Sequence, residues 1–550
     1  MKRQSHRSIL LLALGTAIGG VVTPQNVQDA GARSLEWNAA HVEHLYNRAG
    51  FGASPRDIAR ALERGPEKTV DELIEGEGWI EEPFYTRVRG GQEMRERMMR
   101  MPEDKRDMVK KRMRREDAAQ ARDYLGWWME RILEGTDDLR ERMTLFWHGP
   151  FTSSMQDVKN SHEMILQNQL LRRHALGNFG DMVHGIARDP AMLEYLDNDA
   201  NKKAKPNENF ARELMELFTL GEGNYTEEDI KEAARAFTGW TDRSGEFRFS
   251  RRQHDDGRKT VLGTTGNLDG DDVIDILLEQ EVCARYLAGK LLTYFEGVEA
   301  PAECVERYAT LLRKKDYEIT PFLRTLFLDP DFYRPEIVGG RVASPLDFLV
   351  GASRRMGLDP PSRLVLVGSA TLGERLFYPP NVKGWEGGDA WITTGSLMQR
   401  GNLAGVLLGE VELTDFLDHD PLDDDEALEL DRTPKKRSKK ELKQLRKSLG
   451  VLRELKDVER AGYRPRMKLG GPIKRARARK DRDVVRVVSG VVLAIEIDSA
   501  SLDELTAIFR DMRLEAELPE GGFEDHPREF EKLLRSYSHV LLSLPEAQLH

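Results

Sequence analysis

Residues 206–240 carry the pattern that most constrains the fold of this chain, two amphipathic helices joined by a glycine turn. An α-helix turns by about 100° per residue, so residues three and four positions apart share a face. In the first helix this spacing gathers polar residues on one face, namely Glu208, Arg212, Glu216 and Thr219. It gathers apolar residues on the opposite face, namely Phe210, Leu214, Leu217 and Phe218. Such a helix buries its apolar face against other elements, which predicts a core built from helices.

The ends of both helices carry capping residues. Asn207 suits the N-cap of the first helix, and Gly221 or Gly223 suits its left-handed end. Thr226 and Asp229 have the spacing of a capping box for the second helix. Similar helical patterns recur along the chain, so we predict a mainly α fold. It consists of a large helical domain with small β-hairpin elements and charged insertions.

Short β-prone stretches interrupt the helical patterns. Phe247 and Phe249 precede a turn at Asp256 and Gly257, and residues 260–262 follow it, which predicts a small β element. Residues 484–497 are rich in β-branched side chains, and we expect one or two strands there.

The charged row on the first helix supports two interpretations. Glu–Arg–Glu rows at this spacing commonly brace a helix through ion pairs, and this interpretation needs no chemistry. In a functional interpretation, Arg212 holds two carboxylates apart and leaves Glu213 or Glu216 to act as a general base or metal ligand. Glu208, Arg212, Glu213 and Glu216 are therefore the candidate catalytic residues.

Two histidines provide candidate metal ligands. His254 stands beside Asp255 just before a glycine turn, an arrangement that suits metal ligation or proton transfer. His148 leaves a predicted helix next to aromatic residues. Both also have structural explanations, because aspartates form turns by themselves and a lone histidine is commonly a hydrogen-bonded core group. The sequence identifies no cofactor; a divalent metal is the one that the functional interpretation would need.

Residues 380–391 provide a third candidate site. They contain the sequence N-V-K-G-W-E-G-G followed by a second tryptophan. Glycines let a backbone approach a ligand closely, and tryptophans offer flat apolar faces to a sugar or peptide. Lys383, Trp385 and Trp391 are therefore candidate substrate-binding residues. A loop of this composition also serves simply to close a core.

Charge and motif content exclude several classes of function. The 550-residue chain has a formal net charge of -11, and phosphate binding needs a positive field, so nucleic acid is not an expected partner. The sequence contains no nucleotide-binding glycine loop, no G-x-S-x-G elbow and no H-E-x-x-H motif. Its two cysteines, Cys283 and Cys304, form either a disulfide or two free thiols.

The first 32 residues have the organisation of a signal peptide. Lys2, Arg3 and Arg7 precede the apolar residues 9–22, and a small-x-small cleavage site ends at Ala32. The apolar run is shorter than the roughly 20 residues that span a bilayer. We therefore expect cleavage near Ala32, no transmembrane anchor afterwards, and a secreted or periplasmic protein.

Composition also suggests how the remaining chain is divided. Acidic residues gather at 418–429 and basic residues at 435–440, and charge blocks of this kind are usually solvated. We expect a signal peptide at 1–32, a main helical domain at 33–414 with a charged helical insertion at about 85–120, a flexible charged insertion at 415–483, and a C-terminal segment at 484–550 that packs back on the main domain.

Taken together, these motifs resemble one family of bacterial exported proteins, the Domain of Unknown Function 1800 (DUF1800) family. The similarity begins at residues 44–52, H-L-Y-N-R-A-G-F-G, and continues through residues 139–148, which end in F-W-H. It includes further segments at 189–193, 207–221, 236–240, 254–263, 380–391 and 545–546. A second histidine often closely follows His148 in the family, whereas this chain has Gly149 and Pro150 there and lacks the pair that a two-histidine metal site would need.

The resemblance implies a largely helical, exported protein that is encoded beside a sulfatase- or phosphatase-like partner family, and it implies no established reaction. We favour an accessory or assembly protein that works with such an exported partner. The alternative is a secreted, metal-assisted hydrolase with a Glu/Arg/His polar centre. The two hypotheses differ in whether His148, His254 and the glutamates meet in space.

Overall fold

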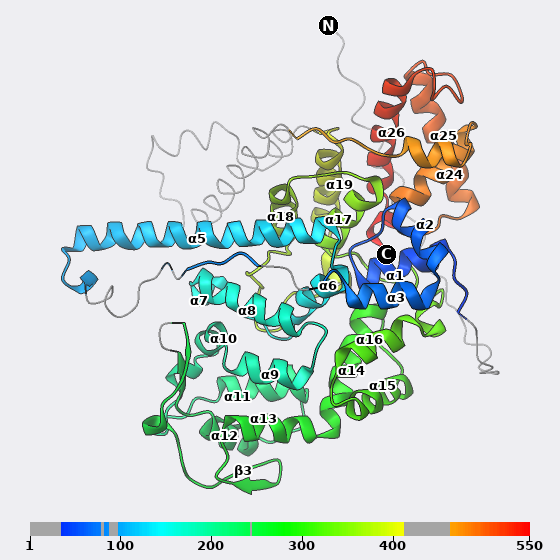
Figure 1. The fold of residues 1–550 in the computed structure, drawn as a ribbon. Coiled ribbons are helices and arrows are strands. Elements are labelled where there is room, and N and C mark those ends of the chain that lie inside the picture. Colours follow the sequence, from blue (N-terminus) through cyan, green and yellow to red (C-terminus); the bar gives the residue numbers. More distant parts are fainter. Residues whose placement is uncertain (1–34, 79–81, 87, 89–96, 243–244, 412–462) are drawn as a thin grey trace. The chain divides into compact units, whose positions relative to one another are not determined.

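Capped helices account for most of the described structure (Figure 1). The computed structural model describes residues 35–78, 82–86, 88, 97–242, 245–411 and 463–550. These residues are mainly α-helical, with two small antiparallel hairpins, which confirms the predicted fold class. Glu36–His550 belong to one compact unit.

Some predictions fall outside the described residues. The predicted signal peptide at 1–32 lies entirely outside them, and of the charged insertion predicted at 415–483 only residues 463–483 are described. Part of the insertion at about 85–120 also lies outside. In the part of the chain that the structure describes, no helix has the length and apolar character needed to cross a membrane.

A long helix dominates the first part of the unit. From Glu103 onward, the charged stretch predicted at about 85–120 belongs to α5, which continues to Glu134 and packs along α8 and α18. The helices of this part are α1 (Ala39–Ala49), α2 (Pro55–Arg64), α3 (Pro66–Glu75), α5 (Glu103–Glu134), α6 (Asp138–Trp147), α7 (Met155–Val158) and α8 (Ser161–His174).

Short helices and both hairpins make up the middle of the unit. The helical elements are α9 (Phe179–Ala187), α10 (Pro190–Tyr195), η1 (Asn198–Ala200), α11 (Asn209–Glu213), η2 (Leu214–Thr219), α12 (Glu227–Ala236) and η3 (Arg251–Gln253). β1 (Trp240–Asp242) pairs with β2 (Phe247–Phe249), with Thr241 opposite Arg248. β3 (Lys259–Val261) pairs with β4 (Thr264–Gly266), with Thr260 opposite Thr265. The predicted small β elements are therefore present.

The remaining helices complete the unit. They are α13 (Gly270–Glu279), α14 (Glu281–Glu296), α15 (Ala302–Lys314), α16 (Ile319–Phe327), η4 (Pro330–Tyr333), α17 (Pro345–Met356), α18 (Ser362–Thr371), η5 (Gly388–Trp391), α19 (Thr394–Leu408), α23 (Gly470–Arg475), α24 (Asp481–Val492), α25 (Ser499–Glu515), α26 (Pro527–Leu542) and η6 (Pro545–Gln548). α14 packs against α15, and α26 packs against α19, so the C-terminal helices contact the main helical part (Figure 1).

The helix predicted near residue 208 forms, but its second half is a π-helix. α11 passes into η2, where the Leu220 amide donates to the Met215 carbonyl at 2.8 Å. The wider turn shifts the helical register. Thr219 is therefore fully buried and donates to the Leu214 carbonyl at 2.7 Å, so its predicted place on the polar face is wrong. The predicted apolar face is buried: Phe210, Leu214, Leu217 and Phe218.

The predicted capping box begins α12. The Asp229 amide donates to Thr226 Oγ1 at 3.2 Å, and the Thr226 amide donates to Asp229 Oδ2 at 2.9 Å. Asp229 Oδ1 also accepts from the Leu262 amide at 2.7 Å. One side chain thus caps α12 and fixes the β3–β4 hairpin against it.

The predicted strands at residues 484–497 are replaced by α24. Its buried valines lie at helical spacing, namely Val484, Val485, Val488 and Val492. Packing of this apolar face against α17, α25 and α26 overrides the β preference of the branched side chains. The strand prediction was therefore wrong.

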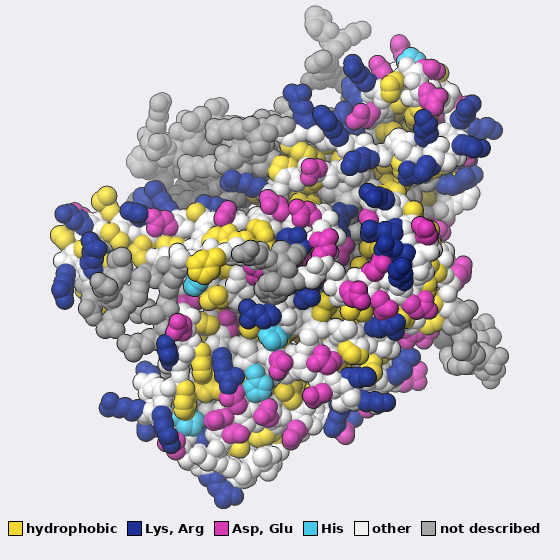
Figure 2. All heavy atoms as spheres, viewed as in Figure 1, with side chains coloured by type: hydrophobic (Ala, Val, Ile, Leu, Met, Phe, Trp, Pro, Cys, Tyr) yellow, Lys and Arg dark blue, Asp and Glu magenta, His cyan; other side chains and the backbone are white. Residues whose placement is uncertain are grey.

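Acidic and basic side chains are interspersed on the surface shown in Figure 2. Exposed ion pairs of the unit include Arg285 with Glu306 at 2.6 Å and Arg324 with Asp71 at 2.7 Å. Each such pair contributes little to stability because water screens it and long side chains must be ordered.

A buried ion pair, in contrast, joins three segments far apart in the sequence. Arg142 of α6 donates to Asp347 Oδ1 of α17 at 2.5 Å, and its Nε donates to the Gly50 carbonyl at 2.8 Å. Asp347 also caps its own helix with Ser344 and lies 3.4 Å from Arg341. Burial alone would raise the pKa of Asp347, but the charges around it, chiefly that of Arg142, hold this pKa well below the usual range.

Substitution of Asp347 tests this pair. Asp347→Asn leaves the Arg142 guanidinium buried without a counter-charge, and we expect a loss of about 3–5 kcal/mol in the free energy of unfolding. Asp503 is a matched control, because it pairs with Arg482 on the surface at 2.7 Å, and Asp503→Asn should change stability by less than about 1 kcal/mol. Urea unfolding measures both; equal losses would contradict this account.

Candidate functional site

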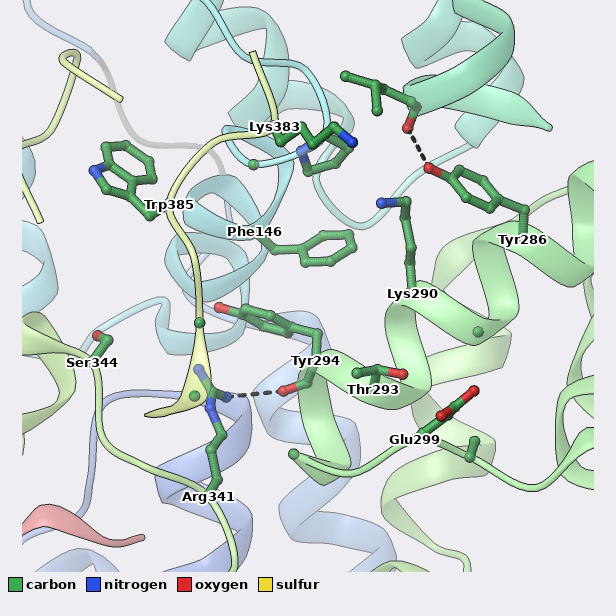
Figure 3. A pocket seen from close by; sticks show the side chains of 18 of the residues that line it. Phe146, Tyr286, Lys290, Thr293, Tyr294, Glu299, Arg341, Ser344, Lys383 and Trp385 are labelled. Atoms are coloured by element: carbon green, nitrogen blue, oxygen red, sulfur yellow. Dashed lines mark hydrogen bonds between the residues drawn. The ribbon is translucent and has the colours of Figure 1, made fainter. Parts of the chain in front are cut away.

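A cavity of 990 Å³ lies between α14, the end of α6, η2 and two loops. The loops are those around residues 340–344 and 382–391 (Figure 3). A cavity of this size can hold a small ligand. Of the candidate site residues taken from the sequence, four line it: Glu216, Lys383, Trp385 and Trp391.

One face of α14 forms a wall of the cavity. The lining residues recur three and four positions apart, namely Tyr286, Gly289, Lys290, Thr293 and Tyr294. The opposite face is buried in the core through Leu287, Leu291 and Phe295. The helix ends at Gly297, which adopts the left-handed conformation. Core packing therefore orients α14 and turns its polar stripe toward the cavity.

Two lysines extend into one region of the cavity from opposite walls. Figure 3 shows Lys290 on α14 and Lys383 on the facing loop pointing toward the same space. Lys290 Nζ lies 4.7 Å from the centre of the Tyr286 ring, and the Tyr286 hydroxyl donates to the Leu217 carbonyl at 3.0 Å. Burial, and then the charge of Lys383, lower the pKa of Lys290.

Other charged groups of the cavity are held by neighbours. Arg341 donates to the Tyr294 carbonyl at 3.0 Å, and Arg142 is the buried partner of Asp347. Glu374 accepts a hydrogen bond from the Leu346 amide at 2.9 Å. Burial, together with the negative charge of Asp347, raises the pKa of Glu374 to about 7.

The candidate catalytic residues on the first helix do not form one centre. Arg212 pairs with Glu208 at 3.3 Å and with Glu227 of α12 at 2.8 Å, instead of with Glu216. Glu216 accepts from the Tyr225 hydroxyl at 3.0 Å and lines the cavity. Burial raises the pKa of Glu213, and the neighbouring Glu216 adds to this shift. Arg212 thus braces α11 against α12, and of the row expected within one helix only the pair with Glu208 forms.

His148 lies in the core at the end of α6. Its Nε2 lies 2.8 Å from Asn168 Nδ2, and its ring packs against Trp128 and Phe377. Burial lowers the pKa of His148 from 6.5 to about 3, and Arg172 adds to this shift. The imidazole is therefore neutral at physiological pH, which lets Nε2 accept the Asn168 hydrogen bond.

His254 and Asp255 lie in a different place, beside the first hairpin. His254 Nδ1 lies 2.9 Å from the Thr238 carbonyl, and Asp255 pairs with Arg235 at 2.8 Å. The Arg235 guanidinium lowers the pKa of Asp255. Neither residue lines the cavity. The structure therefore does not bring His148, His254 and the glutamates together.

Metal-binding side chains do not gather elsewhere in the described ranges either. Among the residues that the structure describes, no group of three or more His, Cys, Asp or Glu side chains is arranged to hold a metal ion. Cys283 is buried, Cys304 is partly buried, and both thiols are free, so the sequence's alternative of a disulfide is not realised.

A glycine contact places the 382–391 loop against α6. A Cβ on Gly384 would lie 3.0 Å from Gly149 Cα and 3.0 Å from its carbonyl oxygen, and Gly384 has a φ of +80°. Only glycine accepts this conformation and this approach without strain. Gly149 thus receives the loop that carries Lys383 and Trp385.

Sequence reasoning missed the residues that α14 contributes. Tyr286, Lys290 and Tyr294 lie in an amphipathic helix of ordinary composition, and no motif marks them. The available signal was their spacing of four residues, which puts them on one face together with Gly289. Arg341 and Glu374 gave no sequence signal, because tertiary contacts alone bring them to the cavity.

Comparison with known proteins agrees with the resemblance seen in the sequence. A family model described as a protein of unknown function (DUF1800) matches residues 44–549. The chain belongs to the DUF1800 family. No curated protein and no solved structure matches it.

Several of the segments that carry the DUF1800 resemblance meet at the cavity. Residues 139–148 supply Phe146, residues 207–221 supply Glu216, and residues 380–391 supply Lys383 and Trp385. The segment at 254–263, which includes His254, packs in the region of the hairpins instead. The cavity is therefore where DUF1800 motifs that are distant in this sequence come together.

A substitution at Gly384 tests the glycine contact. Gly384→Ala puts a side chain in a left-handed conformation and against Gly149, and we expect a loss of about 1–2 kcal/mol or more in stability. Gly387→Ala in the same loop is the control, since its Cβ meets no atom within 4 Å and its φ is -93°. Urea unfolding should separate the two variants; identical stabilities would show that the contact places no constraint on the loop.

The pH dependence of stability tests the environment of His148. Its folded pKa of about 3 lies below the ordinary 6.5, so its contribution is complete above pH 6.5 and is lost as the pH falls toward 3. We expect His148→Gln to cost about 1–3 kcal/mol at neutral pH and to flatten the fall in stability between these pH values.

The control for this titration is the exposed His526. Denaturant melts at several pH values give the free energy of unfolding as a function of pH. The slope of this plot should be that of the wild type in His526→Gln and shallower in His148→Gln. A wild-type slope in both variants would mean that His148 ionises freely in the folded protein.

Proposed function

We propose that this DUF1800 protein is an exported accessory protein that binds a ligand in the α14 cavity. The observation that carries the proposal is the convergence of motif residues from α6, η2 and the 382–391 loop on one cavity of 990 Å³. Binding residues gather in concave, partly apolar sites with a few polar groups. The lining of this cavity, with lysines among aromatic rings, has the composition of such a binding site.

The lining of the cavity suits a ring-shaped or otherwise flat ligand body. Phe146 and Tyr294 lie with ring centres 4.8 Å apart, and Trp385 and Trp391 stand on the facing loop. Aromatic faces bind flat apolar surfaces and the apolar faces of sugars. Thr293 and Ser344 add hydroxyl groups that can orient such a body.

The metal-assisted hydrolase has weaker support than the accessory protein. Its polar centre requires Arg212, the glutamates and the histidines to act at one place. Arg212 instead pairs with Glu227, and both histidines bond to core groups. These contacts are structural, which favours a protein that binds without carrying out that reaction.

Export and partnership form the remaining parts of the proposal. The signal peptide predicted at 1–32 supports delivery to the periplasm or the exterior. The resemblance to DUF1800 proteins supports an exported sulfatase- or phosphatase-like partner. We infer that the accessory protein and its partner bind the same ligand.

A neutral fluorescent probe tests whether the cavity binds ligands. Gly289 lines the cavity and a Cβ there meets no atom within 4 Å, so Gly289→Leu should place a bulky side chain inside the site and obstruct it. Because glycine is a poor helix former, the same change should stabilise α14 by up to about 1 kcal/mol. We expect the wild type to bind N-phenylnaphthylamine saturably and Gly289→Leu to lose this binding while remaining folded.

Gly490→Leu is the matched control for this experiment. Gly490 lies in α24, its Cβ position is also open, and it does not line the cavity. Fluorescence titration should show wild-type affinity in this variant. The absence of saturable binding in the wild type, or unchanged binding in Gly289→Leu, would overturn the proposed function.

A further inference from the structure

We propose that Lys290 and Lys383 form a subsite for the anionic group of the cavity's ligand, a carboxylate, phosphate or sulfate. The inference rests on the proposed function, because it assigns a chemical class to the ligand that the cavity binds. It adds that the ligand combines a negative charge with a flat or ring-shaped body.

Most cations of the cavity already have counter-charges or acceptors. Arg142 pairs with Asp347, Arg285 pairs with Glu281 and Glu306, and Arg341 bonds to the Tyr294 carbonyl. Lys290 differs, because no carboxylate of the described residues lies within ion-pairing distance of its Nζ. Its one close partner in the described structure is the face of the Tyr286 ring.

The second lysine is only weakly committed to its own partner. Lys383 Nζ lies 3.4 Å from Glu222, and these side chains are 64% and 74% exposed. A pair this exposed is screened by water and contributes little, so an entering anion can compete for Lys383. Lys383 therefore remains available to a ligand that reaches Lys290.

Placing two ammonium groups near each other is unfavourable unless an anion lies between them. Burial and the charge of Lys383 both disfavour the charged form of Lys290, whereas the Tyr286 ring favours it. An anion bound to both lysines would offset the repulsion between the two ammonium groups. It would also replace the hydrogen bonds to water that Lys290 loses on burial. The free protein thus holds a partly desolvated charge that an anionic ligand can satisfy.

The position of the lysines also fixes how the ligand lies. Figure 3 shows the Phe146 ring next to the space that Lys290 and Lys383 share, and the Tyr294 ring follows with its centre 4.8 Å from that of Phe146. An anionic group at the lysines would leave the attached body over these rings. Glu216, which also lines the cavity, accepts from the Tyr225 hydroxyl at 3.0 Å, and it is not within ion-pairing distance of Lys290 in the described structure.

Two probes with the same ring system test the subsite. Anilinonaphthalene sulfonate carries an anionic group, and N-phenylnaphthylamine is its neutral counterpart. We expect the wild type to bind the sulfonate about tenfold more tightly than the neutral probe, because the sulfonate gains charge-assisted contacts to Lys290 and Lys383. Lys290→Met should abolish this preference, so that the two probes bind with similar affinity, and a circular dichroism spectrum like that of the wild type would show that the variant is folded.

Two further variants complete the design. Lys290→Arg keeps the charge and should retain most of the preference for the sulfonate. Lys314→Met removes an exposed lysine of α15 away from the cavity and should behave as the wild type. A preference that survives Lys290→Met would overturn the subsite.

The wild-type titrations separate failure of the subsite from failure of the proposed function. If both probes bind with equal affinity and Gly289→Leu blocks them, the cavity binds ligands and the lysine subsite is wrong. If neither probe binds, the proposed function fails and the subsite fails with it.

Discussion

The ion pair between Arg142 and Asp347 is the interaction on which the site depends. Two buried charges are tolerated only when other hydrogen bonds satisfy their remaining donors and acceptors. Arg142 meets this condition by donating to the Gly50 carbonyl, and a cation–π contact adds to this, with its guanidinium carbon 4.0 Å from the centre of the Phe51 ring. Because Arg142 also lines the cavity, the pair that joins α6 to α17 also fixes one wall of the site.

Two further constraints position the other walls of the cavity around the Arg142–Asp347 ion pair. The apolar face of α14 packs into the core, so its polar stripe with Lys290 must face the cavity. The contact between Gly149 and Gly384 then holds the opposite loop against the end of α6. Two lysines from separate segments are thereby brought near each other by packing rather than by attraction. A ligand with a negative charge would relieve the resulting repulsion.

Local signals predicted much of the fold. The Thr226–Asp229 capping box and the apolar face around Phe210 follow from short-range rules and are present. The π-helix at Leu214 and the helix α24 were missed, because tertiary packing set their register and overrode β propensity. Lys383 and Trp385 stood out through their unusual loop, whereas Lys290 resembled any helix residue. Only the three-dimensional structure shows that Lys290 lacks a counter-charge among the described residues.

A titration of the Lys290 amine tests the central claim most directly. Reductive methylation with labelled formaldehyde makes lysine amines visible by NMR, and Lys290→Arg assigns the signal. The account predicts that the pKa of Lys290 lies below the usual lysine range in the free protein. It should rise when anilinonaphthalene sulfonate fills the cavity, because an anion stabilises the ammonium form. A pKa that stays the same at saturation would show that the bound anion does not contact Lys290 and would contradict the account.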